Sequence, residues 1–486
     1  MIPTKNLLAP LAILLLLSCA QNPVTGKKEL MLMTESQEIA LGKESDPAIV
    51  AQYGLYENQD LQRFIEEKGK QMAEVSHRPN LNYTFKILDS PVVNAFAVPG
   101  GYVYFTRGIM GYFNNEAEFA GVLGHEIGHI TARHSAKQYS KQMITQILFI
   151  GGLIVSEEFR QFADVAQQGI GLIFLKFSRD NETESDKLGV EYSTKIGYDA
   201  HEMAGFFRTL KQLSGDNPLM PSFLSTHPDP GDRNVNVGKL ADQAQANIDT
   251  ATLKVNRNTY LKRIDGLIFG DDPRQGFAEK DVFYHPTLKF RFDIPAKWKL
   301  VNTPSQVQMA PEDGKALLVL AIAAEKTLEE ARRKVIDDNK LIVMESYNTT
   351  INGLPAVTMI SEIVPDATQG QTQGAQRLKL ITGLIEYNNA IYKLHGVSEA
   401  TDFNSQYGTF LKSVNSFREL TEVSKLNKKP TLIKIIEATS PATLSHILTQ
   451  QRMPAARHQE LAILNGMELQ TSVEAGTLIK VFGGDY

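Results

Sequence analysis

The sequence has a single cysteine, Cys19, so no disulfide can form within the chain. It also lacks any run of the roughly 20 apolar residues that a membrane-spanning helix needs. The most apolar internal stretch, residues 143–155, is shorter and predicts a buried helix or a hydrophobic lid. The formal net charge is −5 and no strongly basic stretch is present, which argues against nucleic acid as a partner. The length of 486 residues predicts about two to four domains.

The first 18 residues have the pattern of a signal peptide. Lys5 is followed by an apolar run at residues 7–17, which ends in Leu-Leu-Ser-Cys at residues 16–19. This ending resembles a bacterial lipobox, in which Cys19 becomes the lipidated first residue of the mature chain. Because Ala20 follows and not Asp, the resemblance implies an anchor in the outer membrane that faces the periplasm. Residues 19–34 then read as a tether.

The remaining sequence predicts an α+β multidomain protein. Helical periodicity dominates residues 35–257, apart from an alternating strand pattern at residues 83–88 and a strand, turn and strand pattern at residues 94–105. Residues 258–282 are rich in Gly, Asp and Pro and predict a linker. Short alternating runs with two helices indicate a smaller α+β domain at residues 283–420, and residues 429–486 follow a βααβ order.

The motif His-Glu-x-x-His occurs at His125, Glu126 and His129, within a predicted helix at residues 114–135. Positions four apart share one face of a helix, so both imidazoles can reach one metal ion. Glu126 lies beside them and can accept a proton from water. Zinc is the metal expected for two histidines, one carboxylate and one open position. The sequence therefore predicts one Zn²⁺ per chain.

A third ligand is required, and two patterns compete for it. The pattern with a third histidine six residues after His129 fails, because Ser135 stands there and His134 is out of register by one residue. The alternative is a glutamate from a later helix, and Glu182 fits it. Asp186, one helical turn further on, is predicted to hold the second ring nitrogen of a ligand histidine. Glu184 is expected to point into solvent.

Residues of about 22–255 resemble the gluzincins of metallopeptidase family forty-eight, which include BepA-like, HtpX-like and Oma-type proteases. The resemblance rests on the hairpin, the helix at residues 116–134, the stretch from Ser178 to Asp186, and Thr226-His227-Pro228 with Arg233. It implies a mainly helical zinc endopeptidase domain, with the loop of His227 and Arg233 at the cleft. The family often has Ala where this chain has Ser185.

Two roles stay open for the predicted catalytic loop. His227 could donate to the oxyanion, with Arg233 adding positive charge. Alternatively, His227 could occupy the open zinc position and keep the enzyme latent until substrate displaces it. We favour the donor role for Arg233 and latency for His227. Either role leaves Glu126 as the general base.

Asn94, Ala95, Phe96 and Ala97 are predicted to form an edge strand that binds substrate, or a plain hairpin without that role. Substrate bound as an added strand is recognised mainly through its backbone, which favours unfolded or misassembled envelope proteins. The expected role is therefore periplasmic protein quality control. The alternatives are a non-proteolytic assembly or chaperone lipoprotein and a peptidoglycan-associated hydrolase.

Two weaker resemblances concern the C-terminal half. The opening and the close of residues 283–420 look like PsbP-type domains. Residues 429–486 are similar to the peptidoglycan-binding LysM module, although the usual Gly-Asp-Thr-Leu opening is missing. Residues 429–486 are therefore predicted either to bind peptidoglycan or to be a structural copy of the module that does not bind glycan.

Overall fold

The computed structural model describes residues 19–140, 177–214, 222–227, 230–363 and 377–484. The predicted signal peptide and the apolar stretch at residues 143–155 lie outside the described residues. The described residues form two compact units, one of residues up to Gly270 together with Thr431–Gly484, and one of Asp271–Pro430. The mixed α and β, multidomain character that the sequence predicts is confirmed. The predicted domain boundaries stay predictions.

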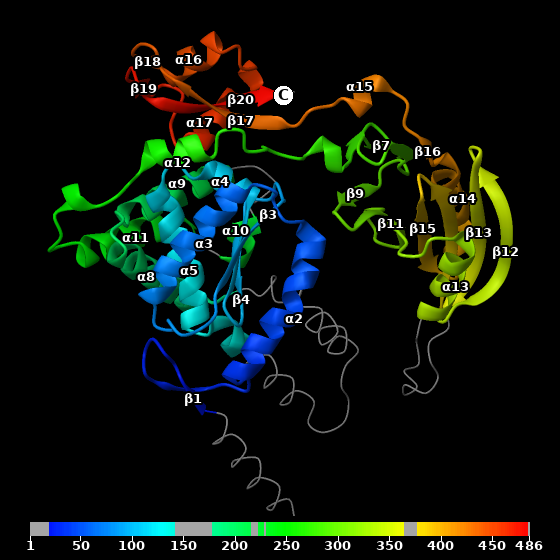
Figure 1. The fold of residues 1–486 in the computed structure, drawn as a ribbon, viewed down its shortest axis with the longest axis horizontal. Coiled ribbons are helices and arrows are strands. Elements are labelled where there is room, and N and C mark those ends of the chain that lie inside the picture. Colours follow the sequence, from blue (N-terminus) through cyan, green and yellow to red (C-terminus); the bar gives the residue numbers. More distant parts are fainter. Residues whose placement is uncertain (1–18, 141–176, 215–221, 228–229, 364–376, 485–486) are drawn as a thin grey trace, which may run out of the picture. The chain divides into compact units, whose positions relative to one another are not determined.

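The first unit begins with a short hairpin of β1 (Cys19–Gln21) and β2 (Lys28–Leu30) (Figure 1). The larger part of this unit consists of one small sheet and of helices that come before and after it along the chain. The elements before the site are α2 (Glu35–Tyr53), α3 (Gln59–Glu74), β3 (Thr84–Leu88), β4 (Ala95–Val98), β5 (Tyr102–Thr106), α4 (Arg107–Tyr112) and α5 (Glu116–Thr131). Those after it are α8 (Arg179–Lys195), α9 (His201–Ser214), α10 (Ser222–Thr226), α11 (Pro230–Ala244), η3 (Thr250–Thr252) and α12 (Arg257–Arg263).

The predicted hairpin at residues 94–105 is confirmed. β4 and β5 pair antiparallel, and both Gly100 and Gly101 of the turn have positive φ angles, which glycine adopts without strain. β5 also pairs parallel with β3, so the sheet has the order β3-β5-β4. β4 is therefore an edge strand of this sheet in the described part of the chain.

The helix that carries His-Glu-x-x-His is entirely buried. Asn115 caps α5 by accepting a hydrogen bond from the Glu118 N–H, and all residues of the helix are buried. The sequence pattern predicts a helix to residue 135, but α5 ends at Thr131. The reason is Arg133, whose φ of 57° lies in the left-handed region and interrupts the helical hydrogen bonding.

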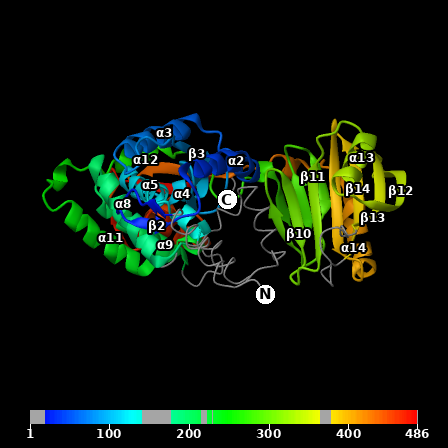
Figure 2. The same ribbon diagram turned by 90° about the horizontal axis from the view of Figure 1, so that it is seen from below.

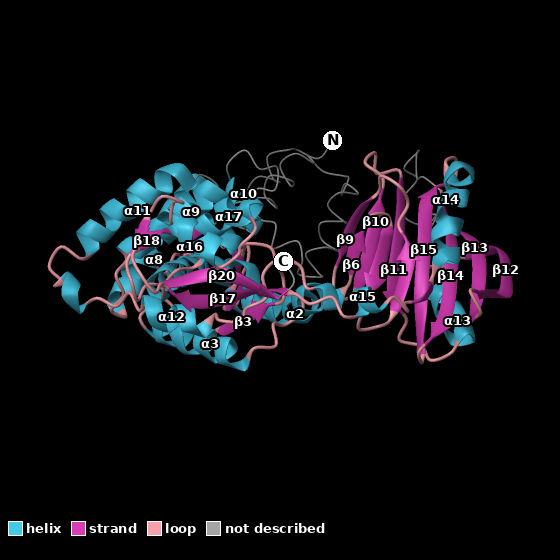
Figure 3. Cartoon of the chain, turned by 90° about the horizontal axis from the view of Figure 1, so that it is seen from above, coloured by secondary structure: helices cyan, strands magenta, loops and turns pink. Residues whose placement is uncertain are grey.

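The C-terminal segment belongs to the core of the first unit. It comprises β17 (Thr431–Glu437), β18 (Ala442–Thr443), α16 (Leu444–Gln450), η5 (Ala455–Arg457), α17 (His458–Leu464), β19 (Ser472–Val473) and β20 (Leu478–Gly484). β17 and β20 pair antiparallel, and β20 contacts α12 (Figure 3). The predicted βααβ order is confirmed. Apolar side chains such as Ile433, Leu461 and Phe482 share one hydrophobic core with Phe113 and Phe119.

A buried lysine joins this segment to the end of α4, just before α5 begins. The Lys480 ammonium donates hydrogen bonds to the carbonyl oxygens of Gly111, Phe113 and Leu464 at 2.8, 2.7 and 2.9 Å. Burial lowers the pKa of Lys480 well below its usual value. Burial also raises the pKa of the nearby Glu118 to about 7.

The second unit is built on a seven-stranded antiparallel sheet of order β12-β13-β14-β15-β11-β10-β9 (Figure 2). Its strands are β9 (Lys299–Asn302), β10 (Gln306–Ala310), β11 (Ala316–Ile322), β12 (Ile342–Ile351), β13 (Leu354–Ile363), β14 (Leu378–Tyr387) and β15 (Ala390–Glu399). A four-stranded sheet contains β6 (Phe277–Glu279), β7 (Val282–His285), β8 (Phe290–Asp293) and β16 (Arg418–Glu419). The remaining helices are η4 (Pro273–Gln275), α13 (Leu328–Asp338), α14 (Phe403–Ser416) and α15 (Val423–Leu426).

Two helices cover opposite faces of the large sheet. Leu380 and Leu384 of β14 share a core with α13, whereas Ile381 and Ile385 share one with α14. Successive residues of a strand point to opposite faces, so the two cores lie on the two sides of the sheet. In the described residues of both units, no helix has the length and hydrophobicity that crossing a bilayer requires.

Candidate metal centre

The two histidines of the motif converge on one carboxylate. The Nε2 atoms of His125 and His129 lie 3.0 Å apart on the same face of α5. Glu182, in the first turn of α8, places its Oε2 3.5 Å from His125 Nε2 and its Oε1 3.4 Å from His129 Nε2. All three side chains are buried.

Glycines let α5 and α8 approach closely enough for this convergence. A Cβ atom added at Gly124 would lie 3.0 Å from the Gly189 Cα, and one added at Gly189 would lie 2.9 Å from the Gly121 carbonyl oxygen. Any larger residue at these positions would push the helices apart. The local sequence of both helices thus sets the distance between the histidines and Glu182.

His227 completes the group. It follows α10, and its Nδ1 lies 3.0 Å from Glu182 Oε1 and 3.3 Å from His125 Nε2. Each of the four residues His125, His129, Glu182 and His227 offers one ligand atom, and these atoms lie within 4.8 Å of one another. Three imidazoles and one carboxylate are a donor set that zinc accepts.

The residues fit a divalent cation on their own chemistry. A neutral imidazole has only one N–H, so the facing Nε2 atoms of His125 and His129 cannot both also satisfy Glu182 and His227 by hydrogen bonds. A cation placed between these lone pairs would satisfy them all. Neither carboxylate oxygen of Glu126 has a hydrogen-bond partner in the described part of the chain, and burial raises the pKa of this group. His227 Nε2 lies 3.7 Å from Glu126 Oε1, beyond hydrogen-bond distance. A buried carboxylate without a hydrogen-bond partner beside ligand histidines is suited to receive a proton.

Asp186 holds the outer side of His125. Its Oδ1 lies 2.9 Å from His125 Nδ1, which leaves Nε2 of the same ring for a metal. Arg233 donates from Nε to Asp186 Oδ2 at 2.9 Å and from Nη2 to Asp186 Oδ1 at 2.5 Å. Burial acts to raise the pKa of Asp186, but the charges and hydrogen bonds of Arg233 and His125 together outweigh it, so the pKa is lowered.

The part of the sequence that contains these residues resembles known proteins. Residues 58–240 match the sequence model of peptidase family M48. These residues are an M48 peptidase domain.

The relatives of this domain are named as proteases. The chain is 31% identical over 214 residues to the mitochondrial metalloendopeptidase OMA1 of Arabidopsis thaliana, covering 44% of this chain and 42% of that protein. It is 28% identical over 233 residues to the beta-barrel assembly-enhancing protease of Yersinia pestis, covering 46% and 47%. The Escherichia coli K12 protein of the same name is 27% identical over 193 residues, covering 38% and 39%. The match thus spans less than half the length of each relative.

Solved structures match this chain only weakly. The solution structure of cyanobacterial PsbP from Synechocystis is 11% identical, with a TM-score of 0.24, and covers 29% of this chain and 94% of that one. A TM-score this low supports no conclusion about the fold. The predicted PsbP-like and LysM-like resemblances stay predictions.

Arg233 lies in the M48 domain among carboxylates. Besides Asp186, its Nη1 lies 3.0 Å from Glu182 Oε2, and the guanidinium packs over the Phe207 ring at 4.2 Å. These contacts suit a residue that orients Glu182 and Asp186. The predicted donation from Arg233 to an oxyanion stays a prediction. Burial opposes the charge of His227, but Glu182 and Glu126 outweigh it, so its pKa is raised.

The predicted substrate strand begins next to α10, the helix that ends just before His227. Asn94 and the residues of β4 (Ala95, Phe96 and Ala97) are buried. The backbone N–H of Phe223 in α10 donates to the Val93 carbonyl oxygen at 3.1 Å, so α10 is fixed just before this strand. A substrate role for these residues stays a prediction.

The sequence reasoning missed the aromatic walls of the site. The Phe223 ring stacks on His227 with centroids 4.5 Å apart, and the Phe177 ring stacks on His129 at 4.0 Å. Both phenylalanines lie in segments without a recognisable motif. Phe177 lies directly before the Ser178 cap of α8, and this closeness to Glu182 was the only signal that could have indicated it.

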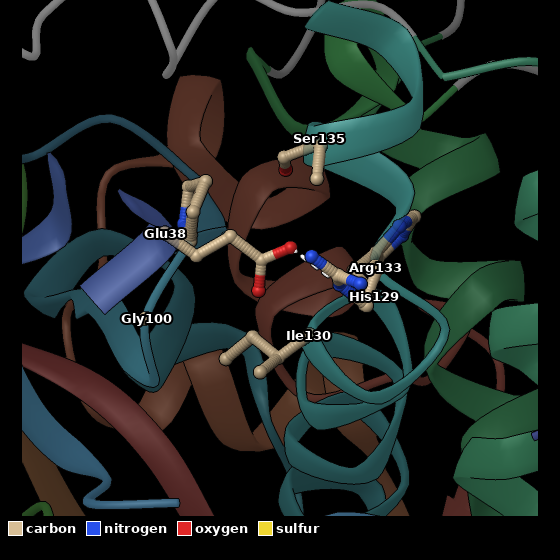
Figure 4. Close-up of a pocket in the computed structure, with 8 residues that line it drawn as sticks. Glu38, Gly100, His129, Ile130, Arg133 and Ser135 are labelled. Atoms are coloured by element: carbon tan, nitrogen blue, oxygen red, sulfur yellow. Dashed lines mark hydrogen bonds and ion pairs between the residues drawn. The ribbon is translucent and has the colours of Figure 1, made fainter. Parts of the chain in front are cut away.

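A small pocket of about 10 Å³ lies on the other side of His129, near the volume that one water molecule needs. Glu38 and Arg133 point toward each other across it, with Gly100 and Ser135 at its rim (Figure 4). The Arg133 Nε donates to Glu38 Oε1 at 2.5 Å. This pair ties α2 to the end of the metal helix.

Proposed function

We propose that this chain is a zinc-dependent endopeptidase with His125, His129 and Glu182 as metal ligands. The observation that carries the proposal is the convergence of these ligand atoms beside the Glu126 carboxylate, which has no hydrogen-bond partner in the described part of the chain. When bound, zinc would polarise the scissile carbonyl and lower the pKa of water toward about 7. The M48 domain and the metalloendopeptidase relatives support this assignment.

Glu126 carries the proton through the reaction. Its carboxylate takes a proton from the attacking water while the oxygen forms a bond with the peptide carbonyl carbon. The proton then passes to the leaving nitrogen as the carbon–nitrogen bond breaks. Burial raises the pKa of this group, which favours the first step, in which Glu126 takes the proton from water.

Substitution of Glu126 by Gln tests this role. The variant should keep zinc, because Glu126 is not a ligand, and lose about 10²- to 10⁴-fold in proteolytic rate. Cleavage of casein, measured with and without a chelator, is compared with zinc content by atomic absorption. Full activity of a zinc-loaded Glu126→Gln chain would contradict the mechanism.

The role of His227 is latency in this proposal. Its Nδ1 lies within the same group of ligand atoms as the other histidines, as expected for a residue in the open metal position. His227→Ala should then raise the rate of casein cleavage. If His227 instead donates to the oxyanion, the same substitution lowers that rate, typically by about 10²- to 10³-fold. The sign of the change decides between the two roles.

The biological role that we propose is quality control of misfolded or misassembled envelope proteins. Support comes from the bacterial relatives, which are named for enhancing the assembly of beta-barrels. Comparing envelope proteomes with the active chain and with Glu126→Gln tests this role, because true substrates accumulate only with the inactive chain. If the active chain and Glu126→Gln restore envelope assembly equally well, the result would favour the non-proteolytic assembly factor. If the chain degrades purified sacculi and a chelator stops this degradation, the result would favour the peptidoglycan hydrolase.

We further propose that lipids on Cys19 hold the chain at the outer membrane on its periplasmic side. The sequence pattern before Cys19 supports this. Each buried methylene contributes about 0.8 kcal/mol, so two or more acyl chains hold firmly. Cys19→Ala should move the chain into the soluble fraction or leave it uncleaved. A processed Cys19→Ala chain that still sediments with membranes would place the anchor elsewhere.

A further inference from the structure

The second metal histidine has an outer partner that the motif does not indicate. His129 Nδ1 lies 3.0 Å from His134 Nδ1, and His134 Nε2 lies 3.0 Å from Glu184 Oε2. His134 is fully buried, whereas the Glu184 side chain is 24% exposed. The expectation that Glu184 points into solvent is therefore wrong.

A break in the helix brings His134 to this position. Five residues along a continuous α-helix correspond to a rotation that ends about 140° away from the starting face. The left-handed Arg133 ends the helical path and turns His134 back toward His129. Glu38 and the Met33 carbonyl oxygen hold the Arg133 guanidinium at 2.5 and 2.8 Å, so buried contacts fix the turn. Figure 4 shows Glu38 and Arg133 pointing toward one another at this turn.

The proton positions along this chain follow from the geometry. His129 directs Nε2 toward Glu182, so its single proton resides on Nδ1 when the ring is neutral. That N–H donates to His134 Nδ1, which must then carry its own proton on Nε2 and donate it to Glu184. The Ser185 Oγ also lies near this ring nitrogen, 3.3 Å from His134 Nδ1.

We propose that His134 and Glu184 are positioning residues for the metal ligand His129. They fix the ring orientation and the tautomer of His129, and the carboxylate at the end of the chain makes its Nε2 more basic. His125 receives the same support directly from Asp186. The two ligand histidines thus each end on a carboxylate, one through a direct contact and one through an imidazole. The inference rests on the metal site of the proposed function, but not on proteolysis.

Zinc affinity of the full chain is the measurement that tests this assignment. The metal is removed with a chelator, and zinc is titrated back against a chromophoric competitor. His134→Phe should weaken zinc binding about 10- to 100-fold, the usual cost of losing such an outer partner. Glu184→Gln should weaken it less, because the amide oxygen still accepts the His134 proton. Asp180→Asn is the matched control, since it removes the same charge from an exposed position on α8 and should bind zinc normally.

A conservative variant separates hydrogen bonding from packing. The Oδ1 of an asparagine can take the place of His134 Nδ1, so His134→Asn should bind zinc more tightly than His134→Phe. Melting of the metal-free variants shows whether each one is folded. Zinc affinity of His134→Phe equal to that of the unmodified chain, or His134→Asn as weak as His134→Phe, overturns the assignment. An unmodified chain that binds no zinc overturns the metal centre itself, and this assignment with it.

Discussion

Histidines withdrawn from water have opposite surroundings in the two units. In the second unit, His285 Nδ1 accepts a hydrogen bond from the Leu288 N–H at 3.2 Å, and His395 Nδ1 lies 2.9 Å from the Thr382 hydroxyl. In the first unit, by contrast, ligand nitrogens of histidines face one another at 3.0 to 3.3 Å. Burial alone therefore leads to ordinary satisfied imidazoles. Convergence of imidazoles that cannot satisfy one another is what distinguishes a metal site.

The largest expected effect comes from removing a histidine in each unit. His125→Ala should lose zinc and proteolysis, with a fall in metal affinity well beyond the roughly 10- to 100-fold of an outer contact. His395→Ala should keep both, because His395 lies in the second unit with its Nδ1 at the Thr382 hydroxyl and belongs to no group of metal ligands in the described residues. Metal content after dialysis and casein cleavage are measured for the two variants side by side. Zinc retained by His125→Ala would remove the basis of the comparison.

Metal removal should destabilise one unit only. A ligand present at about 1,000 times its dissociation constant stabilises the folded state by roughly 4 kcal/mol, and this is lost with a chelator. Trp298 is the single tryptophan of the chain and lies in the second unit, where its ring contacts Phe410 edge-on at 6.1 Å. The thermal transition of its fluorescence should not change, while the loss of helical circular dichroism shifts to lower temperature. Equal shifts of both signals would mean that the units unfold together.

The first unit also contains a buried lysine, Lys480, in its core. Lys480→Met keeps the side-chain volume but leaves the carbonyl oxygens of Gly111, Phe113 and Leu464 without this donor. Unsatisfied buried groups cost about 1–3 kcal/mol each, so we expect a loss of roughly 2–4 kcal/mol in the first unit after partial relaxation. Chemical denaturation followed by circular dichroism measures it. Lys434→Met is the control, because this lysine of β17 is half exposed. Equal stability of both variants would show that the Lys480 hydrogen bonds do not stabilise the contact between the C-terminal segment and the end of α4.

How far the sequence predicts this molecule depends on whether a feature is local. His125, Glu126 and His129 lie on one helix, and Glu182 and Asp186 lie one turn apart on another, so helical spacing places each group. The alternating pattern likewise indicates β17 and β20.

Features that depend on distant contacts could not be predicted in this way. The contact of His134 with His129 requires the left-handed Arg133, whose conformation depends on Glu38, far away in sequence. For the same reason, alternation within β20 does not indicate that Lys480 binds carbonyl oxygens at the end of α4, just before α5.

The smallest expected effect is a pH dependence in the stability of the second unit. Burial lowers the pKa of both His285 and His395 to about 4, below the 6.5 of an ordinary histidine. As the pH falls below about 6.5, the unfolded chain takes up these protons before the folded one does, so stability is full above that value and declines toward pH 4. At a pH of about 5.5, each histidine should cost on the order of 1 kcal/mol. The Trp298 transition therefore shifts to lower temperature between about pH 7 and 5.5.

In the double variant His285→Asn, His395→Asn, the Oδ1 atoms can still take the place of Nδ1 but do not titrate, so the shift should be largely absent. A shift of the same size in that variant would assign the pH dependence to other groups and leave the two histidines without a part in it.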